Sequence, residues 1–256
     1  MRSILLNIAF AAYFLAMVFY FIEMFFRHKA LPLLARVFAL CAVVSLAAYT
    51  VMRWQIAGRP PFSNMFESLV LFALAIGLAL LFVDLRYKVK NVSSLVALLG
   101  LLALGYASFL DKEITPLLPA LKSNWLTIHV LTCFIGYAAL TVGFVSGLVI
   151  LFKKGEIATL DTVSYKIIAF GFLFLTLGIV TGAVWANYAW GTYWSWDPKE
   201  TWSLITWFIY AIYLHTRFVK GWKGRKAAWL AVIGFLAMLF TYFGVNYLLS
   251  GLHSYA

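Results

Sequence analysis

The sequence predicts an all-α integral membrane protein, a bundle of about eight transmembrane helices. Its 256 residues are 64% hydrophobic and only 11% charged, whereas a soluble domain carries about 25% charged residues. Too few polar side chains are present to cover an exterior that faces water, so most of the surface must face lipid. Runs of about 20 apolar residues, the length that crosses a bilayer as a helix, recur along the chain.

Eight apolar runs are predicted to be helices of a single membrane domain that covers residues 1–256. Their approximate bounds are 3–26, 33–53, 65–86, 92–110, 125–152, 167–188, 202–217 and 227–249. The first run is too long for the apolar part of a signal peptide and no small-residue cleavage site follows it, so we expect it to be retained. The small-xxx-small pairs Gly143–Gly147 and Gly178–Gly182 predict close helix packing.

The connections between the predicted helices differ in basic charge. If the first, third, fifth and seventh connections share one side, that side holds 14 of the 20 Lys and Arg residues. The positive-inside rule makes it the cytoplasmic side, which places both termini outside. The net charge of +11 is spread over short loops, which argues against a nucleic-acid partner. The family resemblance described below implies a bacterial inner (plasma) membrane, with a thylakoid membrane as the alternative.

A short stretch between two apolar runs is unusually rich in aromatic rings. Seven Trp and Tyr residues lie in residues 185–202: Trp185, Tyr188, Trp190, Tyr193, Trp194, Trp196 and Trp202. Trp and Tyr often form a belt at the membrane–water interface, but such a belt needs only one or two rings per helix end. A transporter or structural membrane protein whose rings form only such a belt stays open as an alternative. Asp197 and Pro198 have the residue types of an N-cap and a first helical position, so a helix should begin there. We expect the remaining rings to form an external loop that binds a large flat ligand such as haem.

Three of the four histidines have positions suited to a haem iron. His129 lies at the predicted outer start of the fifth helix and His253 near the C-terminus, so both should lie at the depth of the aromatic loop. Two neutral imidazoles there could supply both axial ligands of one iron. His215 follows Trp202 by 13 residues, which places it about 20 Å deeper along a helix, where an ionisable side chain indicates function. His28 is predicted to be solvated.

Two segments carry a resemblance to a known family. WANYAWGTYWSWDPKETWSLITWFIYAIYLHTR (Trp185–Arg217) closely resembles the WWD signature of the haem-handling proteins of cytochrome c assembly. Within that group the chain is similar, over nearly its whole length, to the CcsA/ResC-type subunit of the System II cytochrome c synthase. RWQIAGRPPFSNMFESL (Arg53–Leu69) resembles a second family box.

Residues of the second box also have a structural interpretation. Asn64 and Glu67 have the spacing of a capping box. Arg53 and Arg59 are hypothetical partners of haem propionates, because arginine binds carboxylates through paired hydrogen bonds.

The resemblance implies a function and a set of ligands. The chain would bind haem b and present it outside the membrane for thioether attachment to the C-x-x-C-H motif of apocytochrome c, and would also convey haem through the membrane. His129 and His253 would be the outer iron ligands and His215 an inner ligand. The residues implied to hold the porphyrin are Trp185, Trp190, Tyr193, Trp194, Trp196, Asp197 and Trp202.

The resemblance also implies partners. The chain would be a subunit of a holocytochrome c synthase that is active only with a CcsB/ResB-type membrane subunit, which supplies the second inner ligand. A thiol-reducing, thioredoxin-like protein would keep the apocytochrome cysteines reduced. No acid or base in the sequence has a catalytic assignment beyond haem positioning. The alternative is a haem exporter or chaperone of the CcmC/CcmF-type pathway, which shares the WWD loop.

Overall fold

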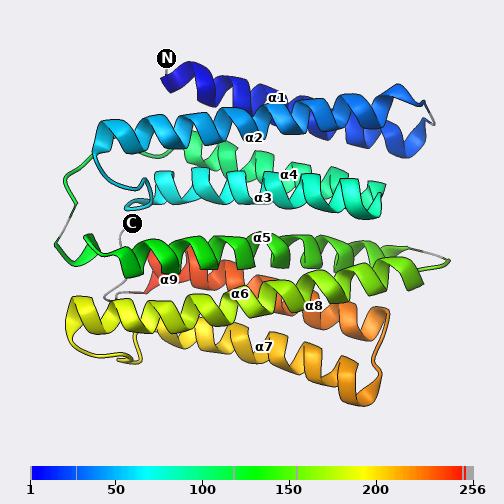
Figure 1. Ribbon diagram of the computed structural model, residues 1–256. Coiled ribbons are helices and arrows are strands. Elements are labelled where there is room, and N and C mark those ends of the chain that lie inside the picture. The colour runs from blue at the N-terminus through cyan, green and yellow to red at the C-terminus, as the bar shows by residue number, and fades with distance from the viewer. Residues whose placement is uncertain (1, 27, 118, 154, 250, 252–256) are drawn as a thin grey trace. The chain divides into compact units, whose positions relative to one another are not determined.

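The computed structural model describes residues 2–26, 28–117, 119–153, 155–249 and 251 (Figure 1). The described part of the chain is helical and contains no strand. It divides into two compact units, Met1–Pro116 and Leu117–Ala256. We predicted that the whole chain forms a single membrane domain. Whether the two units associate into one domain stays a prediction.

The first unit is a four-helix arrangement within the described residues. Its helices are α1 (Arg2–Phe25), α2 (Ala30–Ala57), α3 (Met65–Tyr87) and α4 (Lys90–Ser108). α1 packs against α2 and α4, and α3 packs against the same two helices. Short connections make successive helices antiparallel (Figure 1), which is the up-and-down topology of a helix bundle.

The second unit repeats this pattern with different lengths. Its described elements are the 3₁₀ turn η1 (Pro119–Leu121), α5 (Asn124–Phe152), α6 (Ala158–Trp190), α7 (Pro198–Lys220), α8 (Arg225–Leu239), the π-helix η2 (Phe240–Gly244) and α9 (Val245–Leu248). α5 and α7 each pack against both α6 and α8. The elements α8, η2 and α9 follow one another without a break and act as one long helix.

Each of the eight predicted apolar runs falls on a helix, and the second, sixth and seventh helices extend beyond their predicted bounds, the sixth by the most. Seven of the described helices, with α8 extended to Leu248, are long and apolar enough to span a bilayer. α7 is the remaining long helix, and its two ends carry Lys199, Glu200, Arg217 and Lys220. The prediction of an all-α membrane protein with about eight spans is therefore confirmed closely, and the chain is a multi-pass membrane protein.

Buried ionic groups connect the helix ends in each unit. In the first unit Glu67 accepts hydrogen bonds from Arg53 Nε at 2.7 Å and from Arg59 Nη1 at 2.9 Å. In the second unit the Asp161 carboxylate binds both terminal nitrogens of Arg217, at 2.8 and 2.9 Å. Charges taken out of water need such partners, because an unpaired buried charge is very costly.

The Arg53–Glu67–Arg59 cluster gives a test of the first unit. Because the side chain of Glu67 is fully buried between two guanidinium groups, Glu67→Ala leaves both without their carboxylate. We expect the free energy of unfolding to fall by about 3–5 kcal/mol, measured by denaturation of the purified protein in detergent. Glu156→Ala is the control, because Glu156 is exposed. Equal stability of the two variants would contradict this account.

Candidate functional site

His129 on α5 is held by groups of α6. Its Nδ1 lies 2.7 Å from the carbonyl oxygen of Gly178. A carbonyl can only accept a hydrogen bond, so Nδ1 carries the proton of the neutral imidazole and the acceptor lone pair is on Nε2. The ring also stacks on Trp185, with centroids 6.1 Å apart and planes 14° from parallel. These contacts fix both the tautomer and the plane of the imidazole.

Glycines of α6 provide the space that His129 occupies. A Cβ on Gly182 would lie 2.7 Å from His129 Nδ1 and Cε1, and one on Gly178 would lie 2.6 Å from Cys133 Sγ. Both distances are too short for any side chain, so the helices approach only because glycine stands there. The predicted close packing at Gly178–Gly182 is confirmed, and its consequence is the position of His129.

The aromatic residues of 185–202 divide into separate groups. Trp185 is buried, only 4% exposed, and donates its indole N–H to the carbonyl oxygen of Ala120 at 3.0 Å. Trp190 packs edge-on against it with centroids 4.8 Å apart. Trp194 and Trp196 form a second edge-to-face pair at 5.8 Å, and Trp202 contacts Phe240 at 4.2 Å.

Of the stretch 185–202, only residues 191–197 are non-helical. Residues 185–190 form the end of α6, and Trp202 belongs to α7. Within it Tyr193 is 60% exposed and Trp196 is 69% exposed. Trp196 has a φ of 59°, a left-handed backbone conformation that costs a bulky residue about 1–2 kcal/mol. The loop therefore presents these two rings outward on a constrained backbone.

The start of α7 supplies that constraint. The Asp197 carboxylate accepts from the Lys199 N–H at 3.0 Å, and the Glu200 carboxylate accepts from the Asp197 and Ser195 N–H groups at 3.2 and 2.8 Å. Together with Pro198 in the first helical turn these bonds form a capping box. The predicted helix start is confirmed, and the same box holds the backbone on both sides of Trp196.

The C-terminal helix reaches the same region. Lys199 Nζ donates to the Asn246 side-chain oxygen at 2.8 Å, and Asn246 is buried. Further along, Gly251 lies so close to Asp197 that a Cβ at this glycine would collide with the carboxylate. The structure thus brings the described end of the chain to the aromatic loop. His253, the second predicted outer ligand, lies outside the described residues.

His215 is on the exposed side of α7. It makes no hydrogen bond or ion pair within the described part of the chain, whereas the nearby Tyr213 and Thr216 are buried. The imidazole therefore faces away from the core of the second unit. The structure does not bring His215 together with His129, in agreement with their predicted separation in depth.

The second box belongs to the first unit. Asn64 caps α3 by accepting from the Glu67 N–H at 2.8 Å, as predicted. The hypothesis that Arg53 and Arg59 bind haem propionates gains no support, since both guanidinium groups pair with Glu67. They also donate to backbone carbonyls of the loop after α4, those of Lys112, Glu113 and Thr115.

Sequence reasoning did not find several residues that position the site. Asn246 shows no motif, and Gly182 was predicted only to allow packing. The role of Asn246 depends on its hydrogen bond with Lys199, which is 47 residues away in the sequence. The role of Gly182 depends on its contact with His129 across the α5–α6 interface. The small-xxx-small pair Gly178–Gly182 was the one signal in the sequence that indicated this α5–α6 contact.

A sequence profile described as cytochrome C assembly protein matches residues 62–253. The chain belongs to the cytochrome c assembly protein family. Two relatives are each named cytochrome c biogenesis protein CcsA. The one from Chlamydomonas reinhardtii is 46% identical to this chain, over 82% of this chain and 65% of the relative. The one from Cyanophora paradoxa is 37% identical, over 100% of this chain and 97% of the relative. The chain thus spans about two thirds of the Chlamydomonas relative and nearly all of the other. The resemblance seen in the sequence is confirmed.

A solved structure shares the fold of this family member. It is described as cytochrome c heme lyase CcmF, and it matches with a TM-score of 0.73 and 19% identity, over 95% of this chain and 46% of the other. At this identity the match concerns the fold alone.

The capping box gives a test of the loop. Asp197→Ala removes the acceptor for the Lys199 N–H and should lower the free energy of unfolding by about 1 kcal/mol. Amide hydrogen exchange of residues 195–201 should accelerate correspondingly. Asp197→Asn is the matched control, since an asparagine N-cap is about as good as aspartate. If Asp197→Asn loosens the loop as much as Asp197→Ala, the carboxylate acts other than as a cap.

Proposed function

We propose that this member of the cytochrome c assembly family is the haem-handling subunit of a holocytochrome c synthase. Haem is its substrate, presented at the outer membrane face for attachment to apocytochrome c. The observation that carries this proposal is the geometry of His129. Its Nδ1 is bound to a backbone carbonyl, which places the iron-binding lone pair on Nε2, and a carbonyl partner is the usual orienting contact of a ligating histidine.

The aromatic residues support a porphyrin-sized ligand. Trp185 is buried beside His129 and the half-buried Trp190 packs edge-on against it, while Tyr193 and Trp196 are exposed on the loop that follows. Aromatic rings favour offset stacking and edge contacts with other flat π-systems and contribute large contact areas. In our proposal these residues and Trp194, Trp202 and Asp197 form and brace the outer site, and His253 supplies the second outer ligand.

His215 supports a second, inner haem position that is shared with another protein. Its imidazole is exposed on α7, and an ionisable side chain facing out of a membrane helix calls for a partner group. We infer that a CcsB/ResB-type subunit provides the other axial ligand. Haem b would be held there before it reaches the outer site, with the termini of this chain on the external side of a bacterial inner membrane or thylakoid.

The chemistry of attachment comes from the substrates. Haem supplies vinyl groups, and an apocytochrome C-x-x-C-H segment, kept reduced by a thioredoxin-like protein, supplies two thiols that add across them. The residues of this chain hold the iron, fix the porphyrin plane and limit the approach of the peptide. Such positioning lowers the barrier by making the reaction effectively unimolecular.

The outer site is tested by the double variant His129→Ala plus His253→Ala. Because both proposed axial ligands are removed, we expect the Soret absorbance of the outer haem in the purified protein to be lost and cytochrome c formation to stop. Normal haem content and normal cytochrome c in this variant would refute the assignment.

Gly182→Ala is a subtler variant of the same test, since its methyl group displaces the His129 ring without removing it. It should weaken outer haem binding while His28→Ala, which alters an exposed histidine, leaves it unchanged.

The inner site is tested by His215→Ala in the complex with the partner. Loss of one axial ligand should remove or shift the haem spectrum of the inner site and leave the outer spectrum intact, measured by absorbance of the complex with and without the outer-site variant. A wild-type chain that makes thioether bonds without any second subunit would overturn the partner requirement and favour a pathway of the other type.

A further inference from the structure

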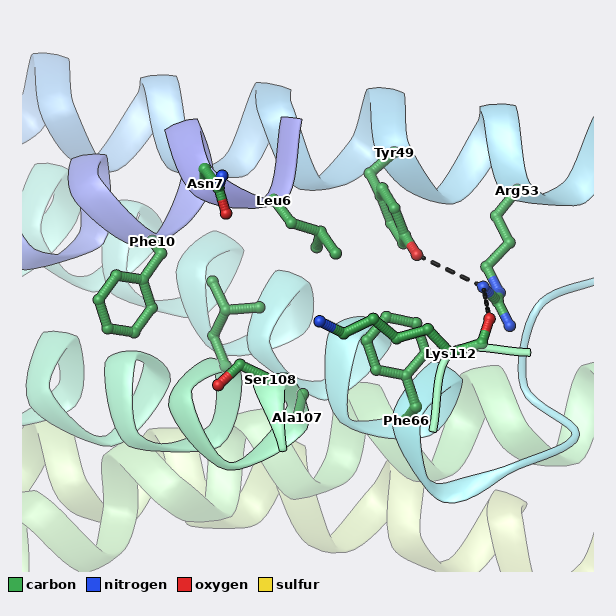
Figure 2. A pocket seen from close by; sticks show the side chains of 10 residues that line it. Leu6, Asn7, Phe10, Tyr49, Arg53, Phe66, Ala107, Ser108 and Lys112 are labelled. Carbon is green, nitrogen blue, oxygen red and sulfur yellow. Dashed lines mark hydrogen bonds between the residues drawn. The ribbon is translucent and has the colours of Figure 1, made fainter. Parts of the chain in front are cut away.

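The first unit contains a cavity that the proposed haem chemistry does not use. Its volume is about 610 Å³, within the range of ligand-binding pockets. Figure 2 shows it between the N-terminal end of α1, the C-terminal ends of α2 and α4, and the start of α3. Apolar residues of α1 and α4 and polar residues at the ends of α2 and α4 line it.

The walls divide by chemistry. Leu6 and Phe10 on α1 and Leu104 on α4 form an apolar side, and these helices qualify as membrane spans. Arg53 and Tyr49 lie at the end of the cavity where the second box and the loop after α4 meet, and the Lys112 side chain runs from that loop away from Arg53, toward Ser108 (Figure 2). A molecule that fills this space therefore needs an apolar part and a polar part.

The polar end carries positive charge without an acidic wall. The lining includes two cationic side chains, Arg53 and Lys112, and no carboxylate. Glu67 neutralises Arg53 from behind but is shared with Arg59, so these three buried groups keep a net charge of +1. Lys112 Nζ extends across the cavity in Figure 2 and makes no hydrogen bond or ion pair within the described residues.

Arg53 is held in place by Glu67 and by the carbonyls of Lys112 and Glu113, so its position is fixed before any ligand arrives. The exposed amide of Asn7 adds a neutral polar group at the rim. A preorganised cationic end with apolar walls is complementary to an anion that carries a hydrocarbon chain.

We propose that this cavity is a binding site for an anionic phospholipid. The headgroup phosphate lies at the Lys112 ammonium, within the positive field of the Arg53–Glu67–Arg59 cluster, and an acyl chain follows Leu6, Phe10 and Leu104 along the helices. The bilayer is the source, because the apolar walls belong to membrane-spanning helices and a free phosphate would leave them uncovered. The bound lipid offsets the net charge of the Arg53–Glu67–Arg59 cluster.

The test uses the full-length chain in detergent micelles with added phosphatidylglycerol or phosphatidylcholine, and counts bound lipid by native mass spectrometry. We expect phosphatidylglycerol to bind more tightly than phosphatidylcholine. Lys112→Gln should weaken phosphatidylglycerol binding about fivefold, the effect of one lysine on an anionic lipid, and leave phosphatidylcholine binding unchanged. Lys122→Gln is the matched control, an exposed lysine outside the cavity.

A second variant tests the cavity itself. Ser108 is exposed and lines the cavity, so Ser108→Trp should fill the space without disturbing the core and should reduce phosphatidylglycerol binding. Equal binding of the two lipids, unchanged binding in Lys112→Gln, or full displacement of phosphatidylglycerol by inorganic phosphate would each overturn the proposal. Haem content and cytochrome c formation are read separately, so failure here leaves the proposed function unaffected.

Discussion

The close approach of α5 and α6 is the constraint on which the candidate site depends. Glycines stand where a Cβ would meet the facing helix: Gly136 faces the backbone of α6, and Gly178 and Gly182 face Cys133 and His129. Without hydrophobic driving force in lipid, helices associate through such close packing. The Gly178 carbonyl of α6 can bind His129 only at this short separation. The glycines therefore determine both how closely the helices pack and which tautomer the imidazole adopts.

Both units place charged groups at helix ends inside an otherwise apolar bundle. Glu67, Asp84 and Asp161 are each buried and each paired with arginine. Arginine suits this role because its planar group binds a carboxylate through two nitrogens, as Arg217 does. Such pairs add little stability over apolar packing, but they are costly to break and thus specify which helix ends meet.

Much of the fold follows from local sequence, and the site follows only in part. Long apolar runs predict helices because lipid leaves the backbone no other way to satisfy its hydrogen bonds. The start of α7 was predicted because Asp197 and Pro198 act on their own neighbours. α6 begins earlier than predicted, at Ala158, because Asp161 lowers local hydropathy but is neutralised by Arg217 on another helix. The Glu67 cluster, the His129 contact with Gly178 and the Lys199–Asn246 bond were missed because they join residues distant in sequence.

The π-helix at Phe240–Gly244 has a consequence for the end of the chain. A π-turn holds one more residue than an α-turn, so every later side chain is rotated by about 100° from the direction a regular helix would give it. Asn246 reaches Lys199 with that rotation in place. Removing one residue from Phe240–Gly244 would restore the regular α-helical hydrogen bonds, but it would also turn the Asn246 side chain away from Lys199 and break their hydrogen bond. The number of residues in this stretch, more than their types, thus decides which way Asn246 points.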